Sequence, residues 1–274
     1  MAGRDGLLAR VWEHVASMDA AVATVRGAPW GAIVTDPSSP QVWDVNYARV
    51  EVSDPSLRLP AVEALAGPAL EAVGARRLHV VLQRPETTLD LLTDLSARGD
   101  AVRWEAIMSA ATETSPATAD HDERDIVELD QDALEFGAVQ RSQDRAFGID
   151  DDEVSDRLCA IEERMRPLGK RFFGILDPAG PGGFAAIAAI VPGDGIAYID
   201  NVVTFPHARR RGHASALVRH LLGRAAVGGA QHVYLLVDTN GPAALYARLG
   251  FDELTRIAST LGPERYQPSS GGGT

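Results

Sequence analysis

The stretch IAYIDNVVTFPHARRRGHA, residues 196–214, decides how this chain folds. Its apolar first part, residues 196–203, predicts a β-strand, and the turn at Pro206 leads into three arginines and a glycine. Hydrophobic residues at helical spacing begin at His213. Because the start of a helix presents unpaired backbone N–H groups and the positive end of its dipole, this strand–turn–helix order predicts a pyrophosphate-binding site. Gly212 suits it, since a residue without Cβ permits close backbone approach.

Two motifs carry a resemblance to a known family. The spacing R-x-x-G-x-A, from Arg209 to Ala214, resembles the acyl-CoA pyrophosphate loop of the GNAT superfamily of N-acetyltransferases, although the arginines by themselves also fit a solvated basic turn. A predicted strand at 232–237 follows, and N-x-x-A-x-L-Y-x-x-L-G-F at 240–251 resembles the second cofactor motif of that family. The resemblance covers roughly residues 121–260. It implies an α/β fold, with a mixed twisted sheet flanked by helices, and the use of acetyl-CoA.

Length and charge limit the other possibilities. A chain of 274 residues is long enough for two domains that each bury a core, and 45% hydrophobic with 23% charged residues is a globular composition. The net charge of −12 disfavours nucleic acid as a partner, because phosphate binding needs an extended basic face. Against this acidic background, the arginines at 209–211 suit one small anionic ligand.

The N-terminal residues and the single cysteine bear on where the protein is located and on whether it binds a metal. Charged residues interrupt residues 1–20, so we expect neither a signal peptide nor a membrane span, and we place the protein in the cytoplasm. The single cysteine, Cys159, excludes an internal disulfide and a cysteine-based zinc cluster. Its neighbours predict a small core residue of a helix rather than a nucleophile. We expect no metal site, since no His/Asp/Glu group has ligand spacing.

The N-terminal half predicts the same kind of domain as the C-terminal half. Residues 72–83 resemble residues 226–237 in sequence, and the two halves have the same order of expected elements. Residues 54–60 contain no glycine and no R-x-x-G-x-A spacing, so this half lacks the phosphate-binding loop. We predict a degenerate GNAT-like domain at 1–112. Its expected helices are 5–25, 59–73 and 87–97, and its expected strands are 31–35, 42–50, 78–83 and 102–110.

The C-terminal half is expected to be the catalytic domain. A linker at 113–122 precedes a GNAT domain at 123–267, and the tail 268–274 is expected to be disordered. The expected elements before residue 196 are a strand at 125–129, helices at 132–145 and 151–166, and strands at 171–176 and 183–191.

The resemblance assigns the cofactor contacts residue by residue. Backbone N–H groups from Arg210 to Ala214, with the side chain of Arg209 or Arg211, are expected to hold the pyrophosphate. The family holds the pantetheine arm on exposed backbone of the preceding strand, freed by a bulge. The expected cofactor-binding set is Val202, Val203, Thr204, Arg209, Arg210, Arg211, Gly212, His213, Ala214, Asn240 and Tyr246.

The resemblance also implies two catalytic residues. Tyr246 stands where the family often places a tyrosine that protonates the leaving thiolate, and a phenol of pKa ~10 is protonated at neutral pH. The alternative is a tyrosine packed on the core. Asp200 is the candidate base, acting directly or through water. In a regular strand its side chain would point to the same side as those of Val202 and Thr204. The alternative is a carboxylate paired with a nearby arginine. Asn240 fits a contact to the CoA arm or a helix cap.

The remaining polar residues have expected places outside the reacting groups or alternative roles. His213 and His220 are expected at the surface or behind the reacting groups, and Asp238 in a turn or cap. The acids of 150–156 fit a solvated helix N-terminus or, alternatively, a funnel for a cationic acceptor. We predict acetyl transfer to a primary amine of a small molecule or peptide within a ternary complex, by a monomer or homodimer. The alternatives are a non-catalytic CoA-binding module and an acyltransferase of other donor or acceptor preference.

Overall fold

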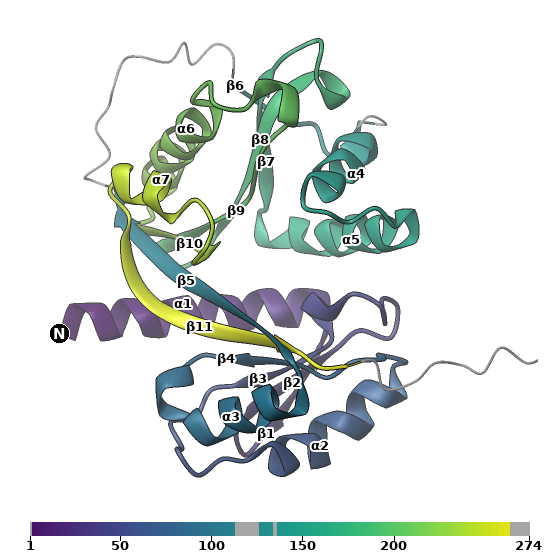
Figure 1. Ribbon diagram of the computed structural model, residues 1–274. Coiled ribbons are helices and arrows are strands. Elements are labelled where there is room, and N and C mark those ends of the chain that lie inside the picture. The colour runs from purple at the N-terminus through teal and green to yellow at the C-terminus, as the bar shows by residue number, and fades with distance from the viewer. Residues whose placement is uncertain (1, 113–125, 134–135, 264–274) are drawn as a thin grey trace, which may run out of the picture. The chain divides into compact units, whose positions relative to one another are not determined.

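The computed structural model describes residues 2–112, 126–133 and 136–263 (Figure 1). The expected linker at 113–122 and tail at 268–274 lie outside the described residues. Contacts divide the chain into two compact units. Unit 1 comprises residues 1–21 and 106–255, and unit 2 comprises residues 22–105 and 256–274.

Each unit contains a segment from the far end of the chain. The N-terminal helix α1 (Ala2–Val22) belongs to unit 1 up to residue 21, and strand β11 (Asp252–Leu261) contributes its last residues to unit 2. The units therefore differ at both ends from the expected ranges 1–112 and 123–267. Hydrophobic periodicity predicts that a helix or strand exists, but it does not say against which core the element packs.

Unit 1 is built on a mixed sheet with helices on both faces. Its strand order is β5–β10–β9–β8–β7–β6, in which β9 and β10 run parallel and the pairs from β6 to β9 run antiparallel. Helices α6 (His213–Val227) and α7 (Ala243–Arg248) lie on one side of these strands, and α4 (Phe136–Ala146) and α5 (Asp152–Met165) on the other (Figure 1). The strands are β5 (Ala101–Ala111), β6 (Ile126–Glu128), β7 (Arg171–Leu176), β8 (Phe184–Pro192), β9 (Ile196–Thr204) and β10 (His232–Asp238).

The expected elements of this unit are confirmed, with small shifts at their ends. Strand β7 and the start of α6 at His213 agree with the prediction. Helix α4 begins at Phe136 instead of Asp132, because the Asp132 N–H donates to the Asp130 carboxylate at 2.9 Å in a local turn. Beneath α6 lies a buried cluster that includes Leu217 and Leu221. On the opposite face, a second cluster packs under α4.

Unit 2 repeats the same order of elements. Its sheet runs β1–β2–β3–β4–β11, with β3 and β4 parallel and helix α2 (Leu59–Ala72) between them in the chain, as α6 lies between β9 and β10. Helix α3 (Leu89–Arg98) then takes the place that α7 takes in unit 1. The strands are β1 (Thr24–Ala28), β2 (Gly31–Thr35), β3 (Tyr47–Val50) and β4 (His79–Leu82).

Two predictions for this unit were wrong. The first helix ends at Val22, and residues 24–28 form strand β1, which the sequence did not indicate because four of its five residues are exposed and show no apolar alternation. The strand expected from Val42 begins only at Tyr47. Residues 43–45 form a 3-10 turn, held by the Asn46 amide, which donates to the carbonyls of Ser39 and Val42 at 2.8 and 2.9 Å.

The final strands of the two repeats are exchanged. In unit 1 the neighbour of β10 is β5, and in unit 2 the neighbour of β4 is β11, whose residues 258–261 pair antiparallel with residues 79–82. Ala258 is fully buried in the core of unit 2. Strand β11 was not among the expected elements. Over the described residues, no helix has the length and hydropathy of a bilayer span.

Candidate functional site

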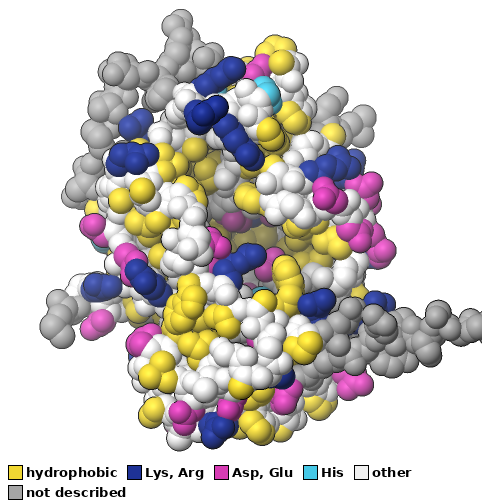
Figure 2. All heavy atoms as spheres, in the orientation of Figure 1, with side chains coloured by type: hydrophobic (Ala, Val, Ile, Leu, Met, Phe, Trp, Pro, Cys, Tyr) yellow, Lys and Arg dark blue, Asp and Glu magenta, His cyan; other side chains and the backbone are white. Residues whose placement is uncertain are grey.

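Strands β9 and β10 pair over only a short distance and then part. Their parallel register covers Ile196–Tyr198 opposite His232–Tyr234, whereas the strands continue to Thr204 and Asp238. Beyond Tyr198 and Tyr234 the facing edges are therefore not joined by the ladder of this pair. Figure 2 shows the surface hollowed between the side that carries α6 and α7 and the side that carries α4 and α5. An extended ligand can reach strand backbone at such an opening.

A β-bulge lies in β9 at the parting of the strands. Ala189 of β8 opposes Asp200, and Ile187 opposes Val203, so two residues of β9, Asn201 and Val202, oppose one residue of β8. Asn201 has a φ of 55°, in the left-handed region. The bulge expected from the family resemblance is thus present in this strand.

The bulge corrects the predicted strand parity. Asp200 lies opposite Ala189, and both Ala189 and Val203 belong to the cluster under α4, while Val202 packs on the cluster under α6. Asp200 therefore faces the same side as Val203, not the side of Val202 as expected. One extra residue in a strand reverses the alternation of every side chain after it.

The basic turn after β9 leads directly into helix α6. Gly212 is the N-cap residue of α6, with a φ of 84°, and it supplies no side chain to cap the first helical N–H groups. Arg210 also has a positive φ, of 63°, and the first turn of α6 contains no acid. The side chains of the three arginines are exposed, and the Arg209 Nε donates to the Thr204 carbonyl at 3.2 Å. The turn therefore combines a helix start without a side-chain cap and positive charge, both of which favour an anion.

The matching helix start in unit 2 is already occupied. The Asp94 carboxylate accepts from the Leu59 N–H of α2 at 3.1 Å and from two nitrogens of Arg58 at 2.6 and 2.7 Å. These bonds lower the pKa of Asp94 to about 2. A carboxylate of the chain thus fills the position that would take a phosphate in unit 1.

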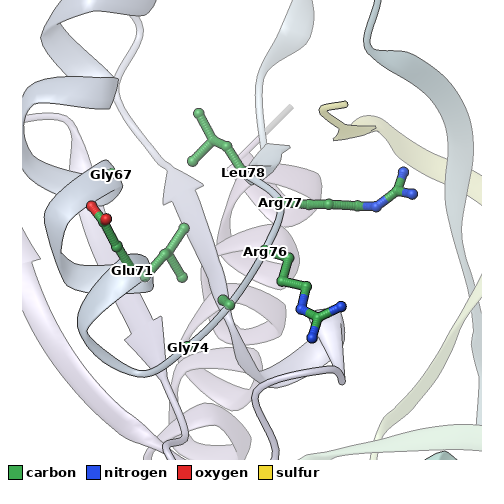
Figure 3. A pocket seen from close by; sticks show the side chains of 8 residues that line it. Gly67, Glu71, Gly74, Arg76, Arg77 and Leu78 are labelled. Atoms are coloured by element: carbon green, nitrogen blue, oxygen red, sulfur yellow. The ribbon is translucent and has the colours of Figure 1, made fainter. Parts of the chain in front are cut away.

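Unit 2 has a pocket elsewhere, at the C-terminal end of α2. Its volume is 320 Å³, and the side chains of Arg76 and Arg77 extend away from Glu71 (Figure 3). The negative end of the helix dipole and Glu71 both disfavour an anion there. The lining residues are Gly67, Leu70, Glu71, Gly74, Ala75, Arg76, Arg77 and Leu78.

Tyr246 lies in the core beneath the second motif. Its side chain is 6% exposed, and its ring meets the Phe251 ring edge to face at 6.0 Å. Burial raises the pKa of the phenol to about 12, so it holds its proton at neutral pH. Within the part of the chain that the structure describes, its hydroxyl makes no hydrogen bond. Tyr246 thus packs on the core, as the alternative predicted, and retains a proton that it can donate.

Asn240 does not cap α7. The N-cap residue of that helix is Pro242, and the Asn240 N–H donates to the Asp238 carboxylate at 2.8 Å. Asp238 therefore forms the turn that was predicted for it. The Asn240 side chain is exposed.

Asp200 belongs to a buried ionic network that the sequence did not reveal. The Nζ atom of Lys170 lies 2.7 Å from the Asp200 carboxylate and 2.6 Å from the Glu162 carboxylate, and the Lys170 side chain is 2% exposed. Both carboxylates also hold the bulge, because Asp200 accepts from the Asn201 N–H at 2.8 Å and Glu162 from the Asn201 amide at 3.0 Å. Burial alone would lower the pKa of Lys170, yet the two carboxylates raise it, so the ammonium stays charged.

The partner of Asp200 is thus a lysine from the loop before β7, not an arginine. Lys170 is the only lysine of the chain, which is the one sequence signal that singled it out. Glu162 lies on α5, among acids of similar appearance, and only tertiary contacts identify it.

The acidic residues at the start of α5 have local partners. Asp151 is the N-cap and accepts from the N–H groups of Glu153 and Val154. Asp152 pairs with Arg145 at 2.8 Å and Asp156 with Arg141 at 3.1 Å, with all four side chains exposed. This agrees with a solvated helix N-terminus. Further along α5, burial is the main cause that raises the pKa of the Cys159 thiol to about 11, which disfavours a thiolate nucleophile.

The two histidines of α6 lie on the helix that follows the basic turn, as expected. His213 is half-buried in the first turn, and the His220 ring lies 5.2 Å from the Phe173 ring. Among the described residues, no group of three or more His, Cys, Asp or Glu side chains is arranged to hold a metal ion.

Comparisons with known proteins agree with this geometry. Residues 124–251 match the model of the acetyltransferase (GNAT) family. A search of curated proteins found no match. Among solved structures, a functionally unknown conserved protein from Staphylococcus epidermidis is 12% identical with a TM-score of 0.70, over 88% of this chain and 94% of that chain.

Two further solved structures share the fold. A GCN5-related N-acetyltransferase from Kribbella flavida is 15% identical with a TM-score of 0.60, over 94% of both chains. A tandem GNAT protein from the clavulanic acid biosynthesis pathway is 14% identical with a TM-score of 0.52, over 81% of this chain and 76% of that chain. At these identities, the structures establish the fold alone. Residues 124–251, a little under half of the chain, are thus a domain of the acetyltransferase (GNAT) family.

Proposed function

We propose that unit 1 transfers an acetyl group from acetyl-CoA to the primary amine of a small molecule or peptide, within a ternary complex. One combination of features carries the proposal: two parallel strands that part after Tyr198 and Tyr234, a bulge at Asn201, and an uncapped basic helix start at Gly212. These features would suit the pantetheine arm along β9 and the pyrophosphate at its far end, which supports the proposal.

The cofactor contacts follow from this path. The backbone of Val202, Val203 and Thr204 runs along the open edge of β9, and these residues would hold the pantetheine arm. The N–H groups of the turn from Arg210 to Ala214, with the side chains of Arg209 and Arg211, would hold the pyrophosphate. Asn240, exposed beside α7, would contact the arm through its amide.

Acetyl transfer needs one proton acceptor and one proton donor. The amine attacks the thioester carbonyl carbon, the C–S bond breaks, and the sulfur leaves as a thiolate that must be protonated. We assign the donor role to Tyr246, whose buried phenol keeps its proton at neutral pH. Asp200 is the proposed acceptor of the amine proton. Because Lys170 holds its carboxylate, we expect Asp200 to act through a water molecule.

The experiment is a comparison of Tyr246→Phe with the unmutated protein. Thiol release from acetyl-CoA is measured in the presence of a panel of primary amines, and CoA affinity is measured by calorimetry. Loss of a general acid costs about 10²–10⁴-fold in rate, so we expect kcat to fall by about 10² and CoA affinity to stay within twofold.

A second reading is a CoA-binding module without catalysis. The burial of Tyr246 and the pairing of Asp200 with Lys170 favour it. If the unmutated protein binds CoA but no amine of the panel stimulates thiol release, this second reading replaces the first. If another acyl donor or an alcohol acceptor gives the higher kcat/KM, the acetyl and amine assignments are replaced while the CoA site stands.

A further inference from the structure

The N-terminal helix α1 is docked onto the acetyltransferase unit. The Arg4 guanidinium donates to the Leu254 carbonyl at 2.6 and 3.0 Å, and Val11 is fully buried. A Cβ atom at Gly193, in the turn between β8 and β9, would lie 3.1 Å from the ring of His14. Helix α1 thus lies close against the strands that carry the proposed site, although it ends at Val22 and the first of these strands, β9, begins only at Ile196.

His14 makes a buried hydrogen bond to β10. Its side chain is 7% exposed, its Nδ1 atom lies 3.2 Å from the Tyr234 hydroxyl, and the two rings meet edge to face at 5.8 Å. Burial lowers the pKa of His14, more than its contact with the Pro192 backbone raises it, and burial raises the pKa of Tyr234. The neutral imidazole and the protonated phenol therefore share one hydrogen bond, between the Nδ1 atom of His14 and the Tyr234 hydroxyl.

Tyr234 connects His14 to Asp200 through Tyr198. Its ring stacks on the Tyr198 ring, with the centroids 5.0 Å apart and the planes at 25°. The Tyr198 hydroxyl donates to the Asp200 carboxylate at 3.3 Å. Tyr198 and Tyr234 are also the last register pair before β9 and β10 part. The imidazole of His14 therefore hydrogen-bonds to one member of the residue pair at which the strands separate.

We propose that His14 is a positioning residue of the acetyltransferase site: it holds Tyr234 against Tyr198 and thereby sets where β9 leaves β10 and where Asp200 lies. This inference rests on the proposed function and adds that α1 is a working part of the catalytic unit. Small displacements near reacting groups have large kinetic effects, since a 1 Å misplacement can cost about 10²-fold in rate.

The test compares two replacements of His14. His14→Phe fills a similar volume but cannot accept the Tyr234 hydrogen bond, and His14→Gln retains a side-chain acceptor. For His14→Phe we expect a kcat about tenfold lower, because β9 and Asp200 lose their fixed position. His14→Gln should recover most of the kcat. Wild-type kcat in His14→Phe would overturn the proposal.

Arg4→Met is the matched control. It weakens the docking of α1 at Leu254 but leaves the contact of His14 with Tyr234 in place, so we expect wild-type kcat. An equal loss of kcat in Arg4→Met and His14→Phe would show that only the docking of the helix matters, and would contradict a positioning role for His14.

A second measurement does not depend on turnover. Amide hydrogen exchange over residues 196–204 should be faster in His14→Phe than in the wild type and unchanged in Arg4→Met. If the unmutated protein transfers no acetyl group, the proposed function fails, while the exchange rates still decide whether His14 holds β9. Exchange at the wild-type rate in His14→Phe would rule out the positioning role of His14 and leave the proposed function standing.

If His14→Phe does not fold, Tyr234→Phe removes the same hydrogen bond from the other side and keeps the stacked ring. We expect the same tenfold fall in kcat and the same faster exchange, and their absence would overturn the proposal.

Discussion

At the scale of single residues, the most informative side chain is Lys170. It is buried between the carboxylates of Glu162 and Asp200, and those carboxylates hold the bulge residue Asn201 by its backbone N–H and its amide. The bulge puts a residue other than glycine at a φ of 55°, so compensating bonds are needed there. This network connects helix α5 to the point where β9 leaves β10.

Replacing Lys170 with Met should strongly destabilise unit 1. The two carboxylates would be left facing each other without their counter-ion, and breaking a buried pair costs about 3–5 kcal/mol. Denaturant unfolding checks this value. The control is Arg171→Met, which breaks an exposed pair with Glu128 and should cost less than about 1 kcal/mol.

Equal free energies of unfolding for Lys170→Met and Arg171→Met would mean that the buried network does not stabilise the bulge.

At the scale of elements, the start of α6 distinguishes the two repeats. In unit 1 the helix begins at Gly212, with no capping side chain and exposed arginines before it. In unit 2 the start of α2 is closed by the Asp94 carboxylate, and residues 51–58 contain no glycine. The same order of strand, helix and parallel strand thus carries a helix start without a side-chain cap in one copy and a self-capped helix in the other.

Gly212→Ala should weaken CoA binding and lower stability together. A residue with a Cβ at a φ of 84° is strained by about 1–2 kcal/mol, and relaxing that strain would move the N–H groups of the turn. We expect CoA affinity to fall about tenfold, the equivalent of about 1.4 kcal/mol, as measured by calorimetry.

The same helix offers a matched control for this change. Gly223 lies inside α6, a Cβ there meets no atom within 4 Å, and Gly223→Ala should stabilise the protein by about 0.5–1 kcal/mol without altering CoA affinity. An unchanged CoA affinity in Gly212→Ala would separate this turn from the phosphate site.

At the scale of the whole molecule, the two repeats depend on each other's chain ends. Unit 1 takes α1 from the N-terminus, and unit 2 takes the end of β11 from the far side of the chain. The buried contacts are specific: Ala258 lies in the core of unit 2, and the His79 Nε2 atom lies 2.8 Å from the Ser259 hydroxyl. Neither half, cut at the expected linker, would contain all of its own core.

Truncation after Thr255 should therefore destabilise unit 2. It removes the strand that pairs with β4 and exposes the buried surface around Ala258. Limited proteolysis should then cleave preferentially within residues 22–105. Truncation after Pro263, which keeps β11, is the control and should retain wild-type resistance. Equal resistance of the two truncated chains would mean that unit 2 does not need this strand.

The sequence by itself determined the elements that depend on local chemistry. Apolar runs and helical spacing predicted β7, β9 and the start of α6 to within a residue or two, and the glycine and arginines of 209–212 marked the helix start without a side-chain cap. It also indicated the repeat and the copy without the phosphate-binding turn. Strand β1 was not predicted, because an exposed edge strand lacks the apolar alternation by which strands are recognised.

Only the tertiary structure decided which parts of the chain meet. The reversed parity after Asn201, the pairing of Asp200 with Lys170, the contact of His14 with Tyr234 and the exchange of β5 and β11 all join residues that are distant in sequence or shifted by one extra residue. Periodicity reports which face of an element is apolar, but several cores can cover that face. The choice among them follows from packing and from the pairing of buried polar groups, which only the folded chain brings together.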